Sequence, residues 1–113
     1  MPFIDSKISI PVSREERENL KADLGRAISI VNKPEGFLML GFEDNYDLYM
    51  GGKKLDKGAF VSVKLFGSAS AREYNALTAE ICRIFKERLG IPGSAVYITY
   101  QGINDWGWDG KNF

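Results

Sequence analysis

The sequence predicts an α/β (α+β) fold in which a tandem β-α-β repeat forms one four-stranded sheet with two helices on one face. Two observations lead to this prediction. The strand-like segment Phe3–Ile10 is echoed by Phe60–Phe66, with Phe3 matching Phe60 at an offset of 57 residues. Each segment is followed by the pattern S-x-x-E, which marks a helix N-terminus. A chain of 113 residues suits one core, so residues 1–113 are predicted to form a single domain.

The two predicted helices begin at matching signals. Ser13 with Glu16, and Ser70 with Glu73, form capping boxes, in which the two side chains bond backbone N–H groups that the helix leaves free. Beyond each box, apolar residues recur at helical spacing, and the two sets match at the same offset: Leu20, Leu24 and Ile28, then Leu77, Ile81 and Phe85. The two halves are therefore predicted to fold alike.

Each predicted helix ends before a further strand. Lys33-Pro34 closes the first helical region, because the residue before proline disfavours the α conformation. Gly90 suits a left-handed cap at the end of the second. The strands that follow are Phe37–Phe42 and Ala95–Tyr100. Right-handed crossovers would make the strands of each β-α-β unit parallel.

The remaining segments are predicted to contain turns. Residues 43–58 are polar, include Gly51-Gly52, and have room for a short strand at Tyr46–Met50. The tail, residues 102–113, combines glycine, asparagine, aspartate and aromatic residues. Because two helices cover only one face of the sheet, the other face is predicted to contact further copies of the chain or to remain solvated.

The composition excludes several classes of function. Lys+Arg and Asp+Glu both number 15, so the basic excess of a nucleic-acid-binding protein is absent. No apolar run reaches membrane-spanning length and the start lacks a secretory signal, so no membrane partner is expected and a cytoplasmic location is the default. There is no histidine and one cysteine, Cys82, so neither an internal disulfide nor a Cys/His zinc site can form. An enzymatic base would be a carboxylate, a lysine, a tyrosine or the amino terminus.

Pro2 is the first candidate for that base, because removal of Met1 would expose its secondary amine. Met-Pro alone is common, and a strand-edge proline without a role is the simpler interpretation of the dipeptide. Here, however, Pro2 immediately precedes an apolar strand that is predicted to be central. Partial burial and a neighbouring cation both lower the pKa of an amine. A base is most effective when its pKa lies near the working pH.

Other candidates have two interpretations each. Lys33 either complements the dipole of the first helix or binds a carboxylate. Tyr97 and Thr99 share one face of their strand, where they line a pocket or belong to a half-exposed strand. Three aromatic residues of the tail either line a pocket or pack against a neighbouring subunit: Trp106, Trp108 and Phe113.

Together these motifs resemble, over the full length of the chain, the macrophage migration inhibitory factor (MIF) family of the tautomerase superfamily. The resemblance rests on the order and spacing of several short segments rather than on any one of them. They are the start MPFI, Asn32-Lys33-Pro34, Phe37–Met39, Met50-Gly51-Gly52, Val63–Gly67, Ile91-Pro92, Val96-Tyr97-Ile98, and Gly107-Trp108-Asp109-Gly110 with Phe113.

The resemblance implies a MIF-like homotrimer whose sheets enclose a channel, with pockets at the subunit interfaces and with no cofactor or metal. It implies keto–enol tautomerisation of phenylpyruvate-like 2-oxo acids, with Pro2 as the general base and Lys33 bound to the substrate carboxylate. The other residues that it assigns to substrate binding are Phe66, at a position whose backbone also contacts ligand in the family, Tyr97 from an adjacent subunit, Thr99, Trp108 and Phe113.

Three positions depart from the family pattern. Thr99 stands where mammalian members have asparagine, Phe66 replaces an aliphatic residue, and Phe37 lacks the hydroxyl of a tyrosine at the pocket edge. An alternative interpretation is therefore a MIF-like cytokine, signalling or ligand-binding protein with weak or vestigial activity. Its receptor or partner protein would be unknown, and it would be secreted without a signal peptide. A third interpretation is an enzyme that dehalogenates or decarboxylates an unsaturated acid, but the sequence contains no convincing set of water-activating residues for those reactions.

Overall fold

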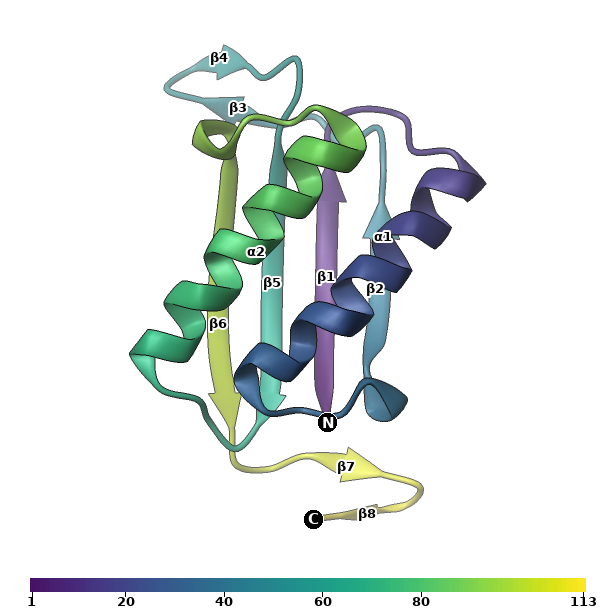
Figure 1. Ribbon diagram of the computed structural model, residues 1–113, viewed down its shortest axis with the longest axis vertical. Coiled ribbons are helices and arrows are strands. Elements are labelled where there is room, and N and C mark those ends of the chain that lie inside the picture. Colours follow the sequence, from purple (N-terminus) through teal and green to yellow (C-terminus); the bar gives the residue numbers. More distant parts are fainter.

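The sheet is built around strand β1 (Pro2–Ile8), along which buried and half-buried side chains alternate. Figure 1 shows the computed structural model, which describes all 113 residues, with β1 and β5 (Ala59–Phe66) at the centre of the sheet. β2 (Met39–Glu43) pairs parallel with β1, and β6 (Val96–Ile103) pairs parallel with β5. The two halves join through antiparallel pairing of β1 with β5. The predicted four-stranded sheet of two β-α-β units is confirmed.

Helices α1 (Arg14–Ala27) and α2 (Ala71–Leu89) lie on one face of this sheet, as Figure 1 shows. Both begin with a complete capping box. In the first, the Ser13 hydroxyl accepts from the Glu16 amide at 3.1 Å, and the Ser13 amide donates to the Glu16 carboxylate at 2.8 Å. The second box, at the start of α2, has the same two bonds at the same distances. Each predicted helix start is therefore present.

The two helical regions end in left-handed residues. α1 continues as a 3-10 helix, Ile28–Val31, which ends at Asn32 with φ 60° and ψ 35°. Asparagine is one of the few residues with a side chain that adopts this conformation readily. α2 ends at Gly90 with φ 69°, where the sequence predicts a glycine cap.

Several strand boundaries differ from the prediction. β6 continues three residues beyond the expected end at Tyr100, and only Tyr49–Met50 of the strand expected at Tyr46–Met50 forms. The strand expected at Phe3–Ile10 ends at Ile8. The Ser9 amide still donates to the carbonyl oxygen of Gly58 at 3.0 Å, but the chain bends at Ser9 and Ile10. β2 begins two residues later than expected, because a 3-10 turn, Glu35–Phe37, precedes it. The remaining short elements are β3 (Tyr49–Met50), β4 (Lys53–Lys54), a 3-10 turn at Gly93–Ala95, β7 (Gly107–Trp108) and β8 (Lys111–Asn112).

The hydrophobic core lies between the sheet and the two helices. One cluster of 20 buried residues includes Ile4 and Ile8 from β1 and Leu77, Ile81 and Phe85 from α2. The sheet thus buries one face only, and the alternation along β1 and β5 follows from that arrangement. Neither helix combines the length and the apolar character that a membrane crossing requires.

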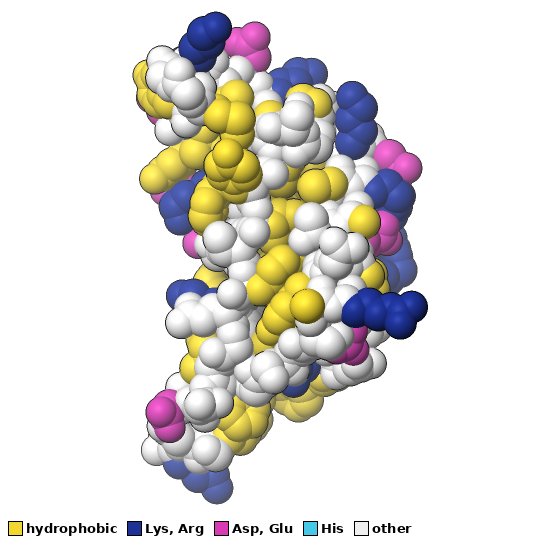
Figure 2. Space-filling view, turned by 90° about the vertical axis from the view of Figure 1, so that its left-hand side faces the viewer, with side chains coloured by type: hydrophobic (Ala, Val, Ile, Leu, Met, Phe, Trp, Pro, Cys, Tyr) yellow, Lys and Arg dark blue, Asp and Glu magenta, His cyan; other side chains and the backbone are white.

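The opposite face of the sheet has no helix over it (Figure 1). Near the carboxyl ends of β1 and β2, the Lys7 ammonium lies 3.3 Å from the Asp5 carboxylate and 3.9 Å from that of Glu43. Aromatic residues accompany these charges, and Tyr97 of β6 leaves 61% of its surface exposed. Figure 2 looks onto the β6 edge of the sheet and shows hydrophobic side chains in a band down the middle of this side. The open face therefore carries charged and aromatic side chains together.

Candidate active site

The start of the chain is fixed against the end of strand β5. Pro2 is buried as the first residue of β1. The amide of Phe66, the last residue of β5, donates a 2.9 Å hydrogen bond to the carbonyl oxygen of Met1. That carbonyl belongs to the peptide group that contains the Pro2 nitrogen, so the nitrogen is held in place by both central strands.

A cavity of about 460 Å³ opens beside Pro2. Its volume lies within the range of small-molecule sites, and a largely apolar lining suits the ring of an aromatic ligand. The wall comes from the start of the chain, from the turn before β2, and from the tail. The lining residues are Met1, Pro2, Phe3, Gly36, Phe37, Leu38, Met39, Trp106 and Trp108.

Lys33 reaches the same end of the sheet from the end of the first helical region. Asn32 in its left-handed conformation and Pro34 in an extended one flank Lys33 and fix the direction of the backbone. The Lys33 ammonium donates a 2.9 Å hydrogen bond to the carbonyl oxygen of Phe66. The one residue Phe66 thus contacts both Lys33, through its carbonyl, and the start of the chain, through its amide.

The surroundings of the amino terminus favour a neutral amine. Partial burial, and then the positive charge of Lys33, lower the pKa of the Met1 amino group below its ordinary value of 8.0. The same two causes would act on the Pro2 nitrogen if it became the terminal amine, because Pro2 is buried and lies one residue further into the sheet. This end of the sheet can therefore hold a basic nitrogen next to a fixed cation.

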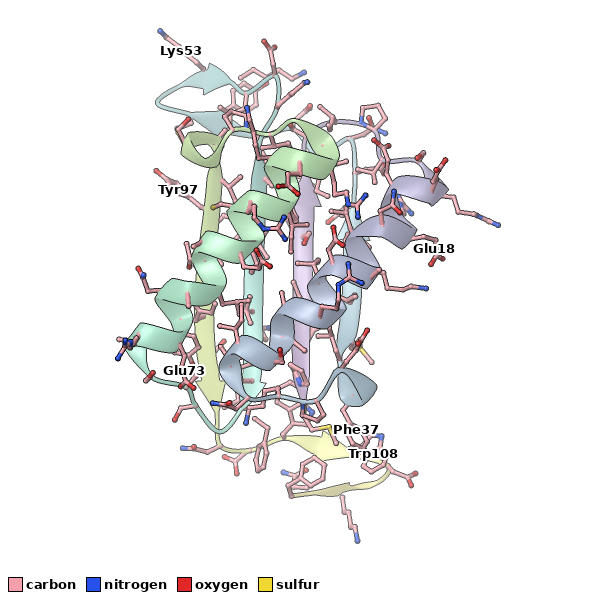
Figure 3. The ribbon with its side chains drawn as sticks, in the orientation of Figure 1. Glu18, Phe37, Lys53, Glu73, Tyr97 and Trp108 are labelled. Atoms are coloured by element: carbon pink, nitrogen blue, oxygen red, sulfur yellow. The ribbon has the colours of Figure 1, made fainter.

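Aromatic rings from the tail gather around this end of the sheet. The Phe113 ring centre lies 5.2 Å from that of Phe66 and 6.3 Å from that of Trp108. Trp108 in turn meets Phe37 edge-on at 6.1 Å, and Figure 3 shows these two side chains next to each other. Five of the residues predicted for the site therefore lie at one end of the sheet: Pro2, Lys33, Phe66, Trp108 and Phe113.

Tyr97 and Thr99 lie elsewhere in the same chain. Strand register places Pro2 opposite Leu65, and Leu65 beside Gly102. From Gly102 back to Tyr97 along β6 is roughly 16 Å at ~3.3 Å per residue. Figure 3 shows Tyr97 at the end of the sheet away from Phe37 and Trp108. Within one chain, these two residues do not join the cavity.

Met39 was not among the residues predicted for the cavity. Met39 is 68% exposed and Phe37 is 53% exposed, both in the segment that enters β2. Large apolar residues directly after Pro34-Glu35-Gly36 are the sequence signal that could have identified them. The strand predicted through residues 37–42 left out the 3-10 turn at Glu35–Phe37. No group of three or more His, Cys, Asp or Glu side chains is placed to hold a metal ion.

Comparisons with known proteins identify the family of the chain. The family model of macrophage migration inhibitory factor matches residues 1–113. A MIF homolog of Trichuris trichiura is 22% identical over 115 residues, which cover all of both chains. The crystal structure of Leishmania major MIF2 shares 29% identity and superposes with a TM-score of 0.93, covering 100% of this chain and 97% of that one.

A more distant solved structure shares the fold alone. It is described as an asymmetric trimer of fused wild-type 4-OT, at 16% identity and a TM-score of 0.84, covering 97% of this chain and 94% of that one. The match to the family model, by contrast, spans the whole chain. The chain therefore belongs to the macrophage migration inhibitory factor family.

Proposed function

We propose that this protein is a keto–enol tautomerase that acts on phenylpyruvate-like 2-oxo acids, with Pro2 as its base. One observation carries the proposal. Pro2 is fixed at the start of a central strand, beside an apolar cavity, and the Lys33 ammonium lies close enough to the amino terminus to lower the pKa of an amine there. A substrate with one carboxylate and one aromatic ring matches this pairing of a cation with an apolar wall.

The base requires removal of Met1. While Met1 is attached, the Pro2 nitrogen is an amide nitrogen and has no basicity. After removal it is a secondary amine, and its neutral form can take a proton from the carbon next to the substrate carbonyl. The electron pair of that C–H bond forms the C=C bond of the enol, and the carbonyl oxygen gains a proton from solvent. The protonated Pro2 then releases its proton, so the net reaction is an isomerisation.

Two donors near Pro2 suit the substrate's oxygen atoms. The Phe66 amide donates to the Met1 carbonyl in the full chain, so loss of Met1 would free this donor beside the new terminus. The Lys33 ammonium uses one of its three protons on the Phe66 carbonyl and has others available. A carboxylate bound by Lys33 and the Phe66 amide would place the carbon to be deprotonated near Pro2. Hydrogen bonds to a charged group are the stronger class, so this clamp favours an acid substrate.

Assembly as a homotrimer would complete the pocket. Tyr97 and Thr99 lie too far from Pro2 in the same chain, yet Tyr97 is exposed on the sheet face that no helix covers. A neighbouring copy would bring these side chains to the cavity. The trimeric arrangement described for the structurally similar 4-OT supports this assembly. In it, Tyr97 and Thr99 would contact the substrate together with Trp108 and Phe113.

A second candidate function has its own support. The relative from T. trichiura carries the name of a macrophage migration inhibitory factor homolog, so binding to a partner protein is a role to be tested beside catalysis. In that case the protein would keep the fold and the pocket, but its tautomerase activity would not be its main function. A slow but Pro2-dependent reaction together with tight binding to a partner protein would favour this alternative.

The deciding experiment compares phenylpyruvate ketonisation by three proteins whose masses are measured first. They are the native chain without Met1, its Pro2→Gly variant, and a chain that retains Met1. We expect the Pro2→Gly rate to fall at least about tenfold, because a positioned general base contributes roughly 10²–10⁴-fold. The chain that retains Met1 is expected to be inactive. Equal rates in all three would refute Pro2 as the base.

A further inference from the structure

The segment that carries Lys33 is bonded to the start of α2. Asn32 ends the first helical region in the left-handed conformation, and its side-chain amide donates a hydrogen bond to the carboxylate of Glu73. The two residues are 41 positions apart in the chain, and Lys33 directly follows Asn32. The contact therefore fixes the backbone from which the Lys33 side chain starts.

Glu73 accepts one side-chain hydrogen bond more than its counterpart in the first repeat, Glu16. One carboxylate oxygen accepts from the Ser70 amide at 2.8 Å, and the other accepts from Asn32. Glu16 accepts only from the Ser13 amide. The bonds from Ser70, together with that from Asn32, lower the pKa of Glu73, so the carboxylate stays charged and keeps both acceptors. The second capping box thus begins α2 and also bonds to Asn32, the residue before Lys33.

Lys33 is held at both of its ends. The ammonium bonds to the Phe66 carbonyl at 2.9 Å, and the backbone is tied through Asn32 to Glu73. The chain between Phe66 and Glu73 is itself fixed, because the Gly67 amide donates to the Ile103 carbonyl at 2.8 Å and the Ser70 capping box follows. These contacts form a closed ring around the junction of β5 with α2.

We propose that Asn32 and Glu73 are positioning residues for the reaction, and that they hold the Lys33 ammonium beside Phe66 before substrate binds. The inference rests on the proposed function, since it assigns Lys33 to the substrate carboxylate. A free lysine side chain is long and flexible, and ordering it at the moment of binding would weaken affinity. A site whose cation is held by its surroundings binds without that loss.

The two halves of the chain offer a matched set of variants for the test. Asn32→Gly removes the side-chain bond but keeps a residue that adopts a positive φ without strain. Glu73→Ala removes both bonds that its carboxylate accepts. Glu16→Ala is the control, because it removes the same capping contact from α1, where no bond to Asn32 exists.

Kinetics with phenylpyruvate give the first measurement. We expect KM to rise about fivefold in Asn32→Gly and Glu73→Ala, with kcat changed less than about twofold, because substrate binding is affected more than proton transfer. Glu16→Ala should lose thermal stability without a change in KM. A native KM in Asn32→Gly would overturn the inference, as would an equal rise in Glu16→Ala.

Solution NMR gives a second measurement that needs no catalysis. The Lys33 nitrogen lies 3.8 Å from the point where a side chain on Gly67 would begin, so the Lys33 ε protons should show a cross-peak to the Gly67 α protons. That cross-peak should weaken in Asn32→Gly and Glu73→Ala but not in Glu16→Ala. If the native chain shows no Pro2-dependent turnover while the cross-peaks change in this way, the proposed function fails and the positioning stands. An unchanged cross-peak in Asn32→Gly overturns the positioning even in an active enzyme.

Discussion

At the scale of single residues, Lys33 combines two effects on the site. Its ammonium lies beside the Phe66 carbonyl, where a substrate carboxylate would bind. Its charge lowers the pKa of the Met1 amino group and would act in the same direction on a Pro2 terminus. The first effect concerns binding and the second concerns the proton-transfer step. The two effects can be separated with one substitution that removes the charge of Lys33 but keeps the length of its side chain. KM then reports on substrate binding, and the pH profile reports on the pKa of the base.

Lys33→Met is expected to raise KM for phenylpyruvate by about tenfold or more, because a hydrogen bond to a charged group contributes roughly 1.5–3 kcal/mol. The variant keeps an apolar chain of similar length, so the fold should persist. Steady-state kinetics measure the change, and Lys21→Met serves as a control because Lys21 pairs with Glu18 on the exposed side of α1. A KM that stays native in Lys33→Met would exclude Lys33 from carboxylate binding.

The same variant predicts a shift in the pH dependence. Catalysis needs the neutral amine, so kcat/KM should rise with pH through the pKa of the terminal nitrogen. Loss of the Lys33 charge should raise that pKa, and the rising limb should move to higher pH. Burial is the larger cause at the Met1 amino group, and Pro2 is itself buried, so the limb should not move all the way to the ordinary amino value. A pH profile that is identical in Lys33→Met and native protein would contradict this account.

At the scale of elements, the sequence predicted the parts that depend on local signals. The capping box at Ser13 and the glycine cap at Gly90 appear where expected, because each is decided by a few adjacent residues. The start of β2 was misplaced, because the turn after Pro34 depends on how the chain returns to the sheet. The exposure of Met39 in the cavity follows from that turn and was equally hidden from sequence reasoning.

Gly90 gives a stability prediction at this scale. Its φ of 69° lies in the left-handed region, where a Cβ costs about 1–2 kcal/mol. Gly90→Ala should therefore lower the free energy of unfolding by about that amount. Gly36→Ala is the matched control, because nothing lies within 4 Å of the added Cβ and its φ is not positive, so its stability should stay within about 0.5 kcal/mol of native. Urea unfolding at one fixed protein concentration measures the free energy of unfolding of both variants. Equal stability in the two would refute the proposed need for glycine in the left-handed conformation at position 90.

At the scale of the whole molecule, the candidate site is incomplete in one chain. The residues near Pro2 could be grouped from the sequence only through the family resemblance, because they come from both repeats and the tail. Local patterns in the sequence did not predict that strand register would leave Tyr97 roughly 16 Å along β6 from Gly102, the residue level with Pro2. A strand's neighbours and its register depend on contacts between distant segments, which no local pattern specifies.

The proposed sharing of the pocket between copies has a direct test by complementation. Pro2→Gly removes the base, and Tyr97→Ala removes the side chain that we assign to the neighbouring pocket. Each variant alone should show low kcat/KM. Co-refolding them in equal amounts should restore native kcat/KM in about one quarter of the pockets, where Pro2 from one chain meets Tyr97 from the next. If Tyr97 acted within its own chain, every pocket would keep one defect and mixing would restore no activity. Sedimentation of the mixture as trimers would then show that the missing activity did not come from failed assembly.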